Sequence, residues 1–167
     1  GTRPRVAGER ELEILEATLE VLDEVGYDLL TMDAVASRAK ASKATLYRRW
    51  ETTASLVIDA LLRAKGAPHV ELPDTGTLRG DLLAAFCGMG GLTDHDMTAT
   101  LGAVITAVST DPEFAREFRE QVVGPKARVG RTIFERALAR GELRPDIDLD
   151  IVAPALSGIV LHRVFIL

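Results

Sequence analysis

Residues Thr31–Trp50 read TMDAVASRAKASKATLYRRW, and this stretch decides the fold of the region around it. It predicts two short helices around a tight turn, because Thr31 and Ser42 are helix-capping residue types that each precede a helical pattern. Over residues 34–50 it holds five basic residues and no acidic one. These five are Arg38, Lys40, Lys43, Arg48 and Arg49. A short basic helix in a protein of net charge −5 is typical of a local DNA-reading element, not of a uniformly basic packing protein.

The helix that follows Ser42 is expected to have two faces. Leu46 and Trp50 lie one turn apart and should face a core. On the outer face, Lys43 and Ala44 would offer an ammonium and a methyl group to base edges, while hydroxyls and guanidinium groups would contact phosphates. The candidate DNA-binding residues are Thr31, Ser42, Lys43, Ala44, Thr45, Tyr47, Arg48 and Arg49. We also expect Arg3 and Arg5 to form an arm along the duplex.

Helical periodicity runs along nearly the whole chain and no strand pattern is present, so the sequence predicts nine helices and an all-α fold. The first helix is expected to end near Gly26, and the fourth to begin at Thr52 or Thr53. Residues 66–74 interrupt the pattern and read as a connection. The predicted organisation is a three-helix DNA-binding domain at 1–50, a connecting helix and linker at 51–74, and a second helical domain at 75–167.

Proline and glycine mark the helix boundaries expected in the second domain. Asp111-Pro112-Glu113 is a strong helix start, with a capping residue and proline in the first turn. Gly124-Pro125 is expected to stop that helix and start another, which Gly141 ends. The last helix begins near Asp148 or Asp150. The later start is favoured because it places Pro154 in the first turn.

Composition limits the class of protein. The chain has 167 residues, 47% hydrophobic and 27% charged, which suits a soluble globular protein with a real core. No run of about 18 apolar residues occurs, so no transmembrane helix and no membrane partner are expected. The single cysteine, Cys87, excludes an internal disulfide and suits the cytoplasm. Because the sequence stops on apolar Leu167, we expect the natural chain to continue.

Residues 10–65 resemble the DNA-binding domain of the tetracycline-repressor (TetR) family of bacterial transcriptional regulators. The matching pieces are ILEATLEVLDEVGYD, TMDAVASRA, and above all SKATLYRRW followed by SLVIDALL. The resemblance implies a homodimer whose third helices enter successive major grooves of a palindromic operator. It implies a phosphate contact for Thr31, base contacts for Lys43 and Ala44, and contacts to the backbone or adjacent bases for Thr45, Tyr47 and Arg49. Trp50 would belong to the core.

Two departures from the family pattern stand out. Lys40 occupies a turn position where glycine is common, so we expect a left-handed backbone there at a cost of about 1 kcal/mol. At the start of the fourth helix, residues 51–53 read Glu-Thr-Thr where the family usually has a lysine for phosphate. That helix is therefore expected to lack the lysine–phosphate contact usual in the family.

Residues 75–167 resemble the family's C-terminal domain more loosely, through DPEFAREF and ERALARGELRPDID. The resemblance implies a small-molecule effector pocket and a dimeric bundle formed by the last two helices. Small residues at 153, 155, 157 and 158, and the apolar end at 165–167, suit such an interface. The candidate effector-binding residues are Phe86, Cys87, Met89, Met97, Leu101, Val104, Phe114, Phe118 and His162. Ordinary core packing is the alternative for each of them.

The function expected is a ligand-responsive DNA-binding transcriptional regulator, a repressor released by a small, mostly apolar effector. Glycines at 88, 90 and 91 would leave room for that effector. No catalytic motif, cofactor or metal site is expected, because the histidines are scattered and Cys87 lacks a Cys-X-X-Cys partner. The main alternative is an all-helical small-molecule or protein-binding module that does not bind DNA. A weaker one is an enzyme that uses Asp94, His95 and Asp96.

Overall fold

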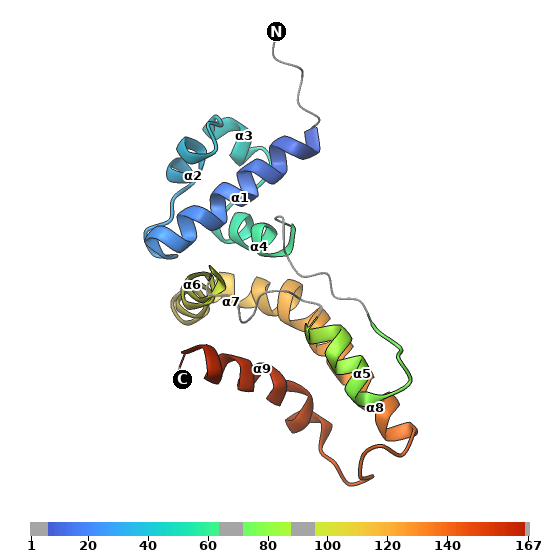
Figure 1. Ribbon diagram of the computed structural model, residues 1–167. Helices are drawn as coiled ribbons and strands as arrows, with labels where there is room; N and C mark the ends of the chain where they lie inside the picture. Colours follow the sequence, from blue (N-terminus) through green and yellow to red (C-terminus); the bar gives the residue numbers. More distant parts are fainter. Residues whose placement is uncertain (1–6, 64–71, 88–95, 166–167) are drawn as a thin grey trace. The chain divides into compact units, whose positions relative to one another are not determined.

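The structure, a computed structural model, describes residues 7–63, 72–87 and 96–165 (Figure 1). These residues form nine α-helices and two π-helical turns and contain no strand, which confirms the all-α prediction. The α-helices are α1 (Ala7–Val25), α2 (Met32–Arg38), α3 (Lys43–Tyr47), α4 (Thr53–Arg63), α5 (Leu78–Leu82), α6 (Asp96–Thr110), α7 (Pro112–Phe118), α8 (Gly124–Ala139) and α9 (Leu149–Phe165). The π-helical turns are Leu83–Cys87 and Arg119–Val123. No helix among the described residues is long and apolar enough to cross a membrane.

The chain divides into two compact units, and the first joins residues 1–67 to residues 99–119. Within it α1 packs against α2 and α4, and α2 packs against α3. Leu15, Val35, Leu46 and Leu56 are fully buried, one from each of these helices. Complete burial of such an aliphatic side chain contributes about 1.5–3 kcal/mol. The apolar periodicity of the sequence is therefore what positions α3.

Side-chain caps fix the ends of the two short helices, as predicted. The Thr31 side chain accepts a hydrogen bond from the Ala34 amide, and Ser42 accepts one from the Thr45 amide. Each cap satisfies an amide that has no partner inside its helix, which contributes about 1 kcal/mol. With α2 and α3 only seven and five residues long, these caps and the buried face define them.

The turn between α2 and α3 contains a left-handed residue that is not glycine. Lys40 has φ 51°, as expected. Its amide donates to the Ser37 carbonyl, and the next amide, of Ala41, donates to the Ala36 carbonyl at 2.8 Å. This pair of bonds is the Schellman motif, in which glycine is the usual left-handed residue. Lys40 therefore carries backbone strain in the turn that orients α3.

Helices α6 and α7 belong largely to the first unit, together with the N-terminal helices. Tyr27, just beyond α1, donates a hydrogen bond of 2.7 Å to Asp111, the N-cap of α7. Its ring lies against Phe114 with centroids 4.9 Å apart. Burial, together with the bond to Asp111, raises the pKa of Tyr27. The same bond lowers the pKa of Asp111.

The second unit joins residues 68–98 to residues 120–167, and within it α8 packs against both α5 and α9. Its buried polar centre is Asp81, which is fully enclosed. Asp81 accepts hydrogen bonds from the amide and hydroxyl of Thr75 at 2.6 and 2.8 Å. Arg140 lies 3.4 Å from the same carboxylate and 2.6 Å from Glu142. These contacts fasten the segment before α5 to the end of α8.

The predicted start of a helix at Gly124-Pro125 is confirmed, since α8 begins at Gly124, but the predicted stop of the preceding helix is wrong. Helix α7, the π-helical turn Arg119–Val123 and α8 follow one another without a gap, and Val123 has helical backbone angles. A proline lacks an amide hydrogen and crowds the preceding turn, and a π-helical turn shifts the bonding pattern so that the helix accommodates it. The end of α8 is as predicted, with Gly141 at φ +77°.

The last helix uses the earlier of its two candidate starts, so the preference for the later one is wrong. It begins at Leu149, with the Asp148 carboxylate accepting from the Asp150 amide at 2.9 Å. Pro154 therefore lies inside the helix. It removes only the bond that its nitrogen would have donated to the carbonyl four residues earlier. An acidic cap at the helix start offsets that loss.

Candidate nucleic-acid interface

Of the eight predicted DNA-binding residues, Thr31 caps the start of α2, and the other seven lie on α3 or directly beside its ends. Seven of the eight are exposed and Thr45 is half-buried. Tyr47 keeps 53% of its surface exposed, which is unusual for an aromatic side chain without a partner surface. The face available for contact is therefore polar, basic and partly aromatic.

The opposite face of the same segment is the anchor. Leu46 is fully buried and Trp50 is 4% exposed, as predicted. The Trp50 indole nitrogen donates a hydrogen bond of 2.9 Å to Asp59 on α4. Asp59 in turn lies 3.5 Å from Arg63. Packing and this polar contact fix the end of residues 43–50, called the reading segment below, against α4.

Lys43, at the start of α3, pairs with Asp33 in the first turn of α2. The distance from the Lys43 ammonium to the Asp33 carboxylate is 2.5 Å, and both side chains are more than half exposed. The hydrogen bond to Asp33 raises the pKa of Lys43, so the lysine remains charged. A residue predicted to contact bases thus has a carboxylate partner, Asp33, that the sequence pattern did not predict.

Arg49, at the far end of the reading segment, is tied to α1. Its guanidinium lies 3.1 Å from Glu11, which also contacts Arg63 at 2.8 Å. Glu11 is half-buried and bridges residues from two other segments. Arg49 is therefore both a predicted phosphate contact and a structural tie in the free protein.

The Arg48 guanidinium is exposed and, among the described residues, forms no ion pair. Arg38, at the end of α2, contacts Glu20 and Glu24 on α1 at 3.2 and 2.5 Å. These bonds lower the pKa of Glu24 and raise that of Arg38. The sequence carried a signal for such pairing, because acidic residues concentrate at 9–28, but it did not say which acid meets which base.

The start of α4 is capped by hydroxyl groups where the family usually carries a lysine. The Thr52 hydroxyl accepts from the Ser55 amide at 3.1 Å, and the Ser55 hydroxyl accepts from the Thr52 amide at 3.3 Å. This reciprocal arrangement matches a capping box. Glu51, just before it, is exposed. The start of α4 therefore supplies no cation of its own.

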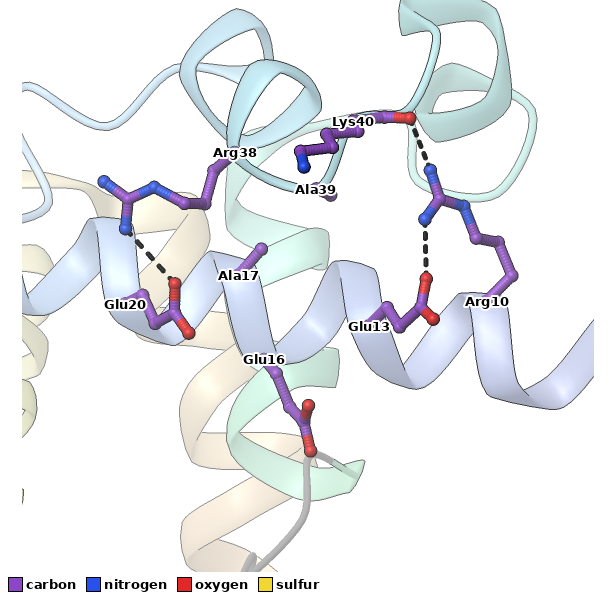
Figure 2. Close-up of a pocket in the computed structure, with 8 residues that line it drawn as sticks. All are labelled: Arg10, Glu13, Glu16, Ala17, Glu20, Arg38, Ala39 and Lys40. Carbon is purple, nitrogen blue, oxygen red and sulfur yellow. Dashed lines mark hydrogen bonds and ion pairs between the residues drawn. The ribbon is translucent and has the colours of Figure 1, made fainter.

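An open hollow of about 290 Å³ lies between α1 and the end of α2 (Figure 2). It is lined by Arg10, Glu13, Glu16, Ala17, Glu20, Arg38, Ala39 and Lys40. Arg10 crosses it, donating to Glu13 and to the Lys40 carbonyl, each at 2.6 Å. Such a charged lining differs from the mostly apolar effector pocket predicted in the second domain. The hollow instead contains the bond that holds the strained turn to α1.

The predicted effector-binding residues fall in several places. Val104 and Phe114 are buried in the first unit, where Phe114 also stacks on half-buried Phe118 at 5.7 Å. Leu101 is half-buried on α6, and His162 is exposed on α9. The side chains of Phe86, Cys87 and Met97 lie outside the described set, as does the whole of Met89. The effector site therefore stays a prediction.

Other predicted features also lie outside the described residues. The whole residues are Arg3, Arg5, the glycines at 88, 90 and 91, Asp94, His95 and the last two residues, 166 and 167. For Asp96 and Phe165 only the backbone is described. Within the described part, no group of three or more His, Cys, Asp or Glu side chains is placed to hold a metal ion.

Two capped helices around a fixed turn, with an anchored second helix that exposes basic and aromatic side chains, define a helix-turn-helix DNA-binding protein. Residues 14–60 match the family described as bacterial regulatory proteins, tetR family. Residues 72–167 match the tetracyclin repressor-like C-terminal domain. The chain belongs to the TetR family of transcriptional regulators, which bind DNA and are not enzymes.

Relatives that match over most of their length support the same conclusion. An uncharacterised HTH-type transcriptional regulator of Mycobacterium tuberculosis is 37% identical over 166 residues, which are 97% of this chain and 79% of the relative. The DNA-binding transcriptional repressor TetR of Mycobacteroides abscessus is 34% identical, over 92% of this chain and 81% of the relative. The crystal structure of a TetR family transcription regulator, SCO0332, matches with a TM-score of 0.66 and 32% identity, covering 95% of this chain and 87% of that one.

Proposed function

We propose that this chain is a cytoplasmic, ligand-responsive repressor that binds a palindromic operator as a homodimer. The observation that carries the proposal is the arrangement of α3. Its inner face is anchored by Leu46 and Trp50, and its outer face presents Lys43, Tyr47 and Arg48 to the surroundings. A helix held in this way fits the major groove, and two copies would read two half-sites one turn of DNA apart.

The roles proposed for the site residues follow from their chemistry. Lys43 and Ala44 would meet base edges at the start of the reading helix. Thr31, Tyr47 and Arg48 would contact phosphates and set the register of the protein on the duplex. Ser42 and Thr45 share a 2.8 Å hydroxyl contact, so they preorganise the helix start while keeping capacity for a further bond to phosphate.

The homodimer is proposed from the second unit. Ile151 and Ile159 on α9 are 67% and 64% exposed, which is unusual for isoleucine on a protein surface. Small side chains between them would allow a second helix to approach closely. A small, mostly apolar effector would bind in the same domain and favour a conformation with misplaced reading helices, so that operator affinity falls.

Selection from random duplex DNA tests the proposal. Purified protein, shown to be folded and dimeric, is mixed with random duplexes at near-physiological salt, and the bound DNA is recovered and sequenced. The expected result is an enriched palindrome with matched half-sites. Absence of any enriched sequence would refute operator binding. A single enriched half-site would refute binding of the dimer to a palindrome and leave the reading helix in place.

A further inference from the structure

Asp33 is an exposed carboxylate of the reading head, which is the helix-turn-helix at residues 31–50. Negative charge there weakens binding to DNA. Its side chain is 58% exposed, and its neighbour across the turn is the Lys43 ammonium at 2.5 Å. Phosphates repel a carboxylate at this position, so the acid lowers affinity for any duplex unless it makes a favourable contact of its own. Helix capping does not require it, because the Thr31 hydroxyl already caps α2.

The Asp33–Lys43 pair matches the major-groove edge of one base pair. A G·C pair presents guanine N7 and O6 as acceptors and, beside them, the cytosine N4 amino group as a donor. Guanine O6 and cytosine N4 are themselves hydrogen-bonded, so they lie about 2.9 Å apart. The structure places one donor, the Lys43 ammonium, next to one acceptor, the Asp33 carboxylate, at a comparable separation.

We propose that Asp33 and Lys43 together read one G·C base pair in each operator half-site. The Lys43 ammonium donates to guanine, and the Asp33 carboxylate accepts from the cytosine amino group. This inference rests on the proposed function, because it requires α3 to lie in the major groove. It makes Asp33 a specificity-determining residue and gives a reason for an acid on the surface that meets DNA.

The pairing also affects binding to other sequences. An ammonium held by a carboxylate is less available to a phosphate, because transfer to the phosphate leaves Asp33 unpaired beside the negatively charged duplex. A guanine edge beside a cytosine amino group satisfies both side chains without separating them. The pair therefore favours the correct base pair and weakens non-specific binding at the same time.

The test uses the selected operator and its single-base-pair variants, measured by fluorescence anisotropy at one salt concentration. For the wild-type protein we expect one G·C position per half-site at which any other pair weakens binding about tenfold or more. In Asp33→Ala this preference should fall to severalfold or less. Binding to a random duplex should strengthen, and the slope of log K against log salt should become more negative by about 0.9 per protomer. Asp33→Glu keeps the acceptor and should retain the preference for G·C.

Glu51→Ala is the matched control, because it also removes one exposed carboxylate beside the reading helix. It should strengthen random-duplex binding without changing any base preference. Thermal melting checks that each variant folds, and Lys43→Met provides a second variant that should lose the same G·C preference. Unchanged preferences in Asp33→Ala, or different positions affected by Asp33→Ala and Lys43→Met, would overturn the inference while leaving operator binding intact. Failure of the wild-type protein to select any palindrome would overturn the proposed function and this inference with it.

Discussion

Replacing Lys40 by glycine should stabilise the first unit. Lys40 holds φ 51° in the turn between α2 and α3, a conformation that costs a residue with a Cβ about 1–2 kcal/mol. Glycine removes that strain but loses about 0.4–1 kcal/mol through the greater freedom of the unfolded chain. The bond from Arg10 goes to the Lys40 carbonyl, so glycine retains it. The net expectation is a gain of about 1 kcal/mol, or about a fivefold larger folding equilibrium constant.

Urea denaturation followed by circular dichroism and by Trp50 fluorescence measures this gain. For a slope of about 1–3 kcal/mol/M, the midpoint should rise by roughly 0.3–1 M. Lys40→Ala is the control, because it removes the same charge and stem but keeps the Cβ and therefore the strain. Its midpoint should stay close to that of the wild-type protein. If the glycine and alanine variants had the same stability, the left-handed strain assigned to this turn would be refuted.

The opposite change applies at Gly141, which holds φ +77° at the end of α8: Gly141→Ala should lower the free energy of unfolding by about 1 kcal/mol, measured by the same denaturation. Bonds from Thr75 lower the pKa of Asp81, so this carboxylate stabilises the fold above its unfolded-state pKa of about 3.9 and loses that effect as the pH falls through its lower folded-state value. Wild-type stability should therefore decrease with acid below about pH 4, and Asp81→Asn, less stable at pH 7, should show a shallower decrease in pH-dependent melting. Arg48 and Lys40 are the reading-head cations without an ion pair among the described residues, so the salt slope of operator binding should be nearer −4 than −9 for a dimer, roughly 0.9 per cation used. A slope near −9 would show that the paired cations also exchange their carboxylates for phosphates.

Local features of the fold were predictable from the sequence, because each depends on a few neighbouring residues. The caps at Thr31 and Ser42, the glycine ends of α1 and α8, and the buried face of α3 all follow from residue type and spacing. The strain at Lys40 was predictable for the same reason. A tight turn there needs a left-handed residue, whatever side chain it carries.

The two wrong helix boundaries have a common cause. One prediction rests on Gly124-Pro125 and the other on the position of Pro154, so both depend on a proline. In the structure the surrounding chain compensates, through a π-helical turn in the first case and an Asp148 cap in the second. Proline is a strong signal that a helix is disturbed, but whether the helix ends depends on bonding partners that spacing does not reveal.

The distribution of charge on the reading head was the least predictable part, because it depends on contacts between helices. Counting residues 34–50 gives five cations and no acid, yet α1 and the first turn of α2 supply carboxylates to Arg38, Lys43 and Arg49. A DNA-binding surface with all its cations free would bind any duplex strongly, since phosphates are the same in every sequence. Paired cations leave a carboxylate unpaired when they move to phosphate, so only a site that offers compensating contacts is bound well. We therefore expect the Asp33–Lys43 pair proposed above to lower the affinity for sequences that do not match.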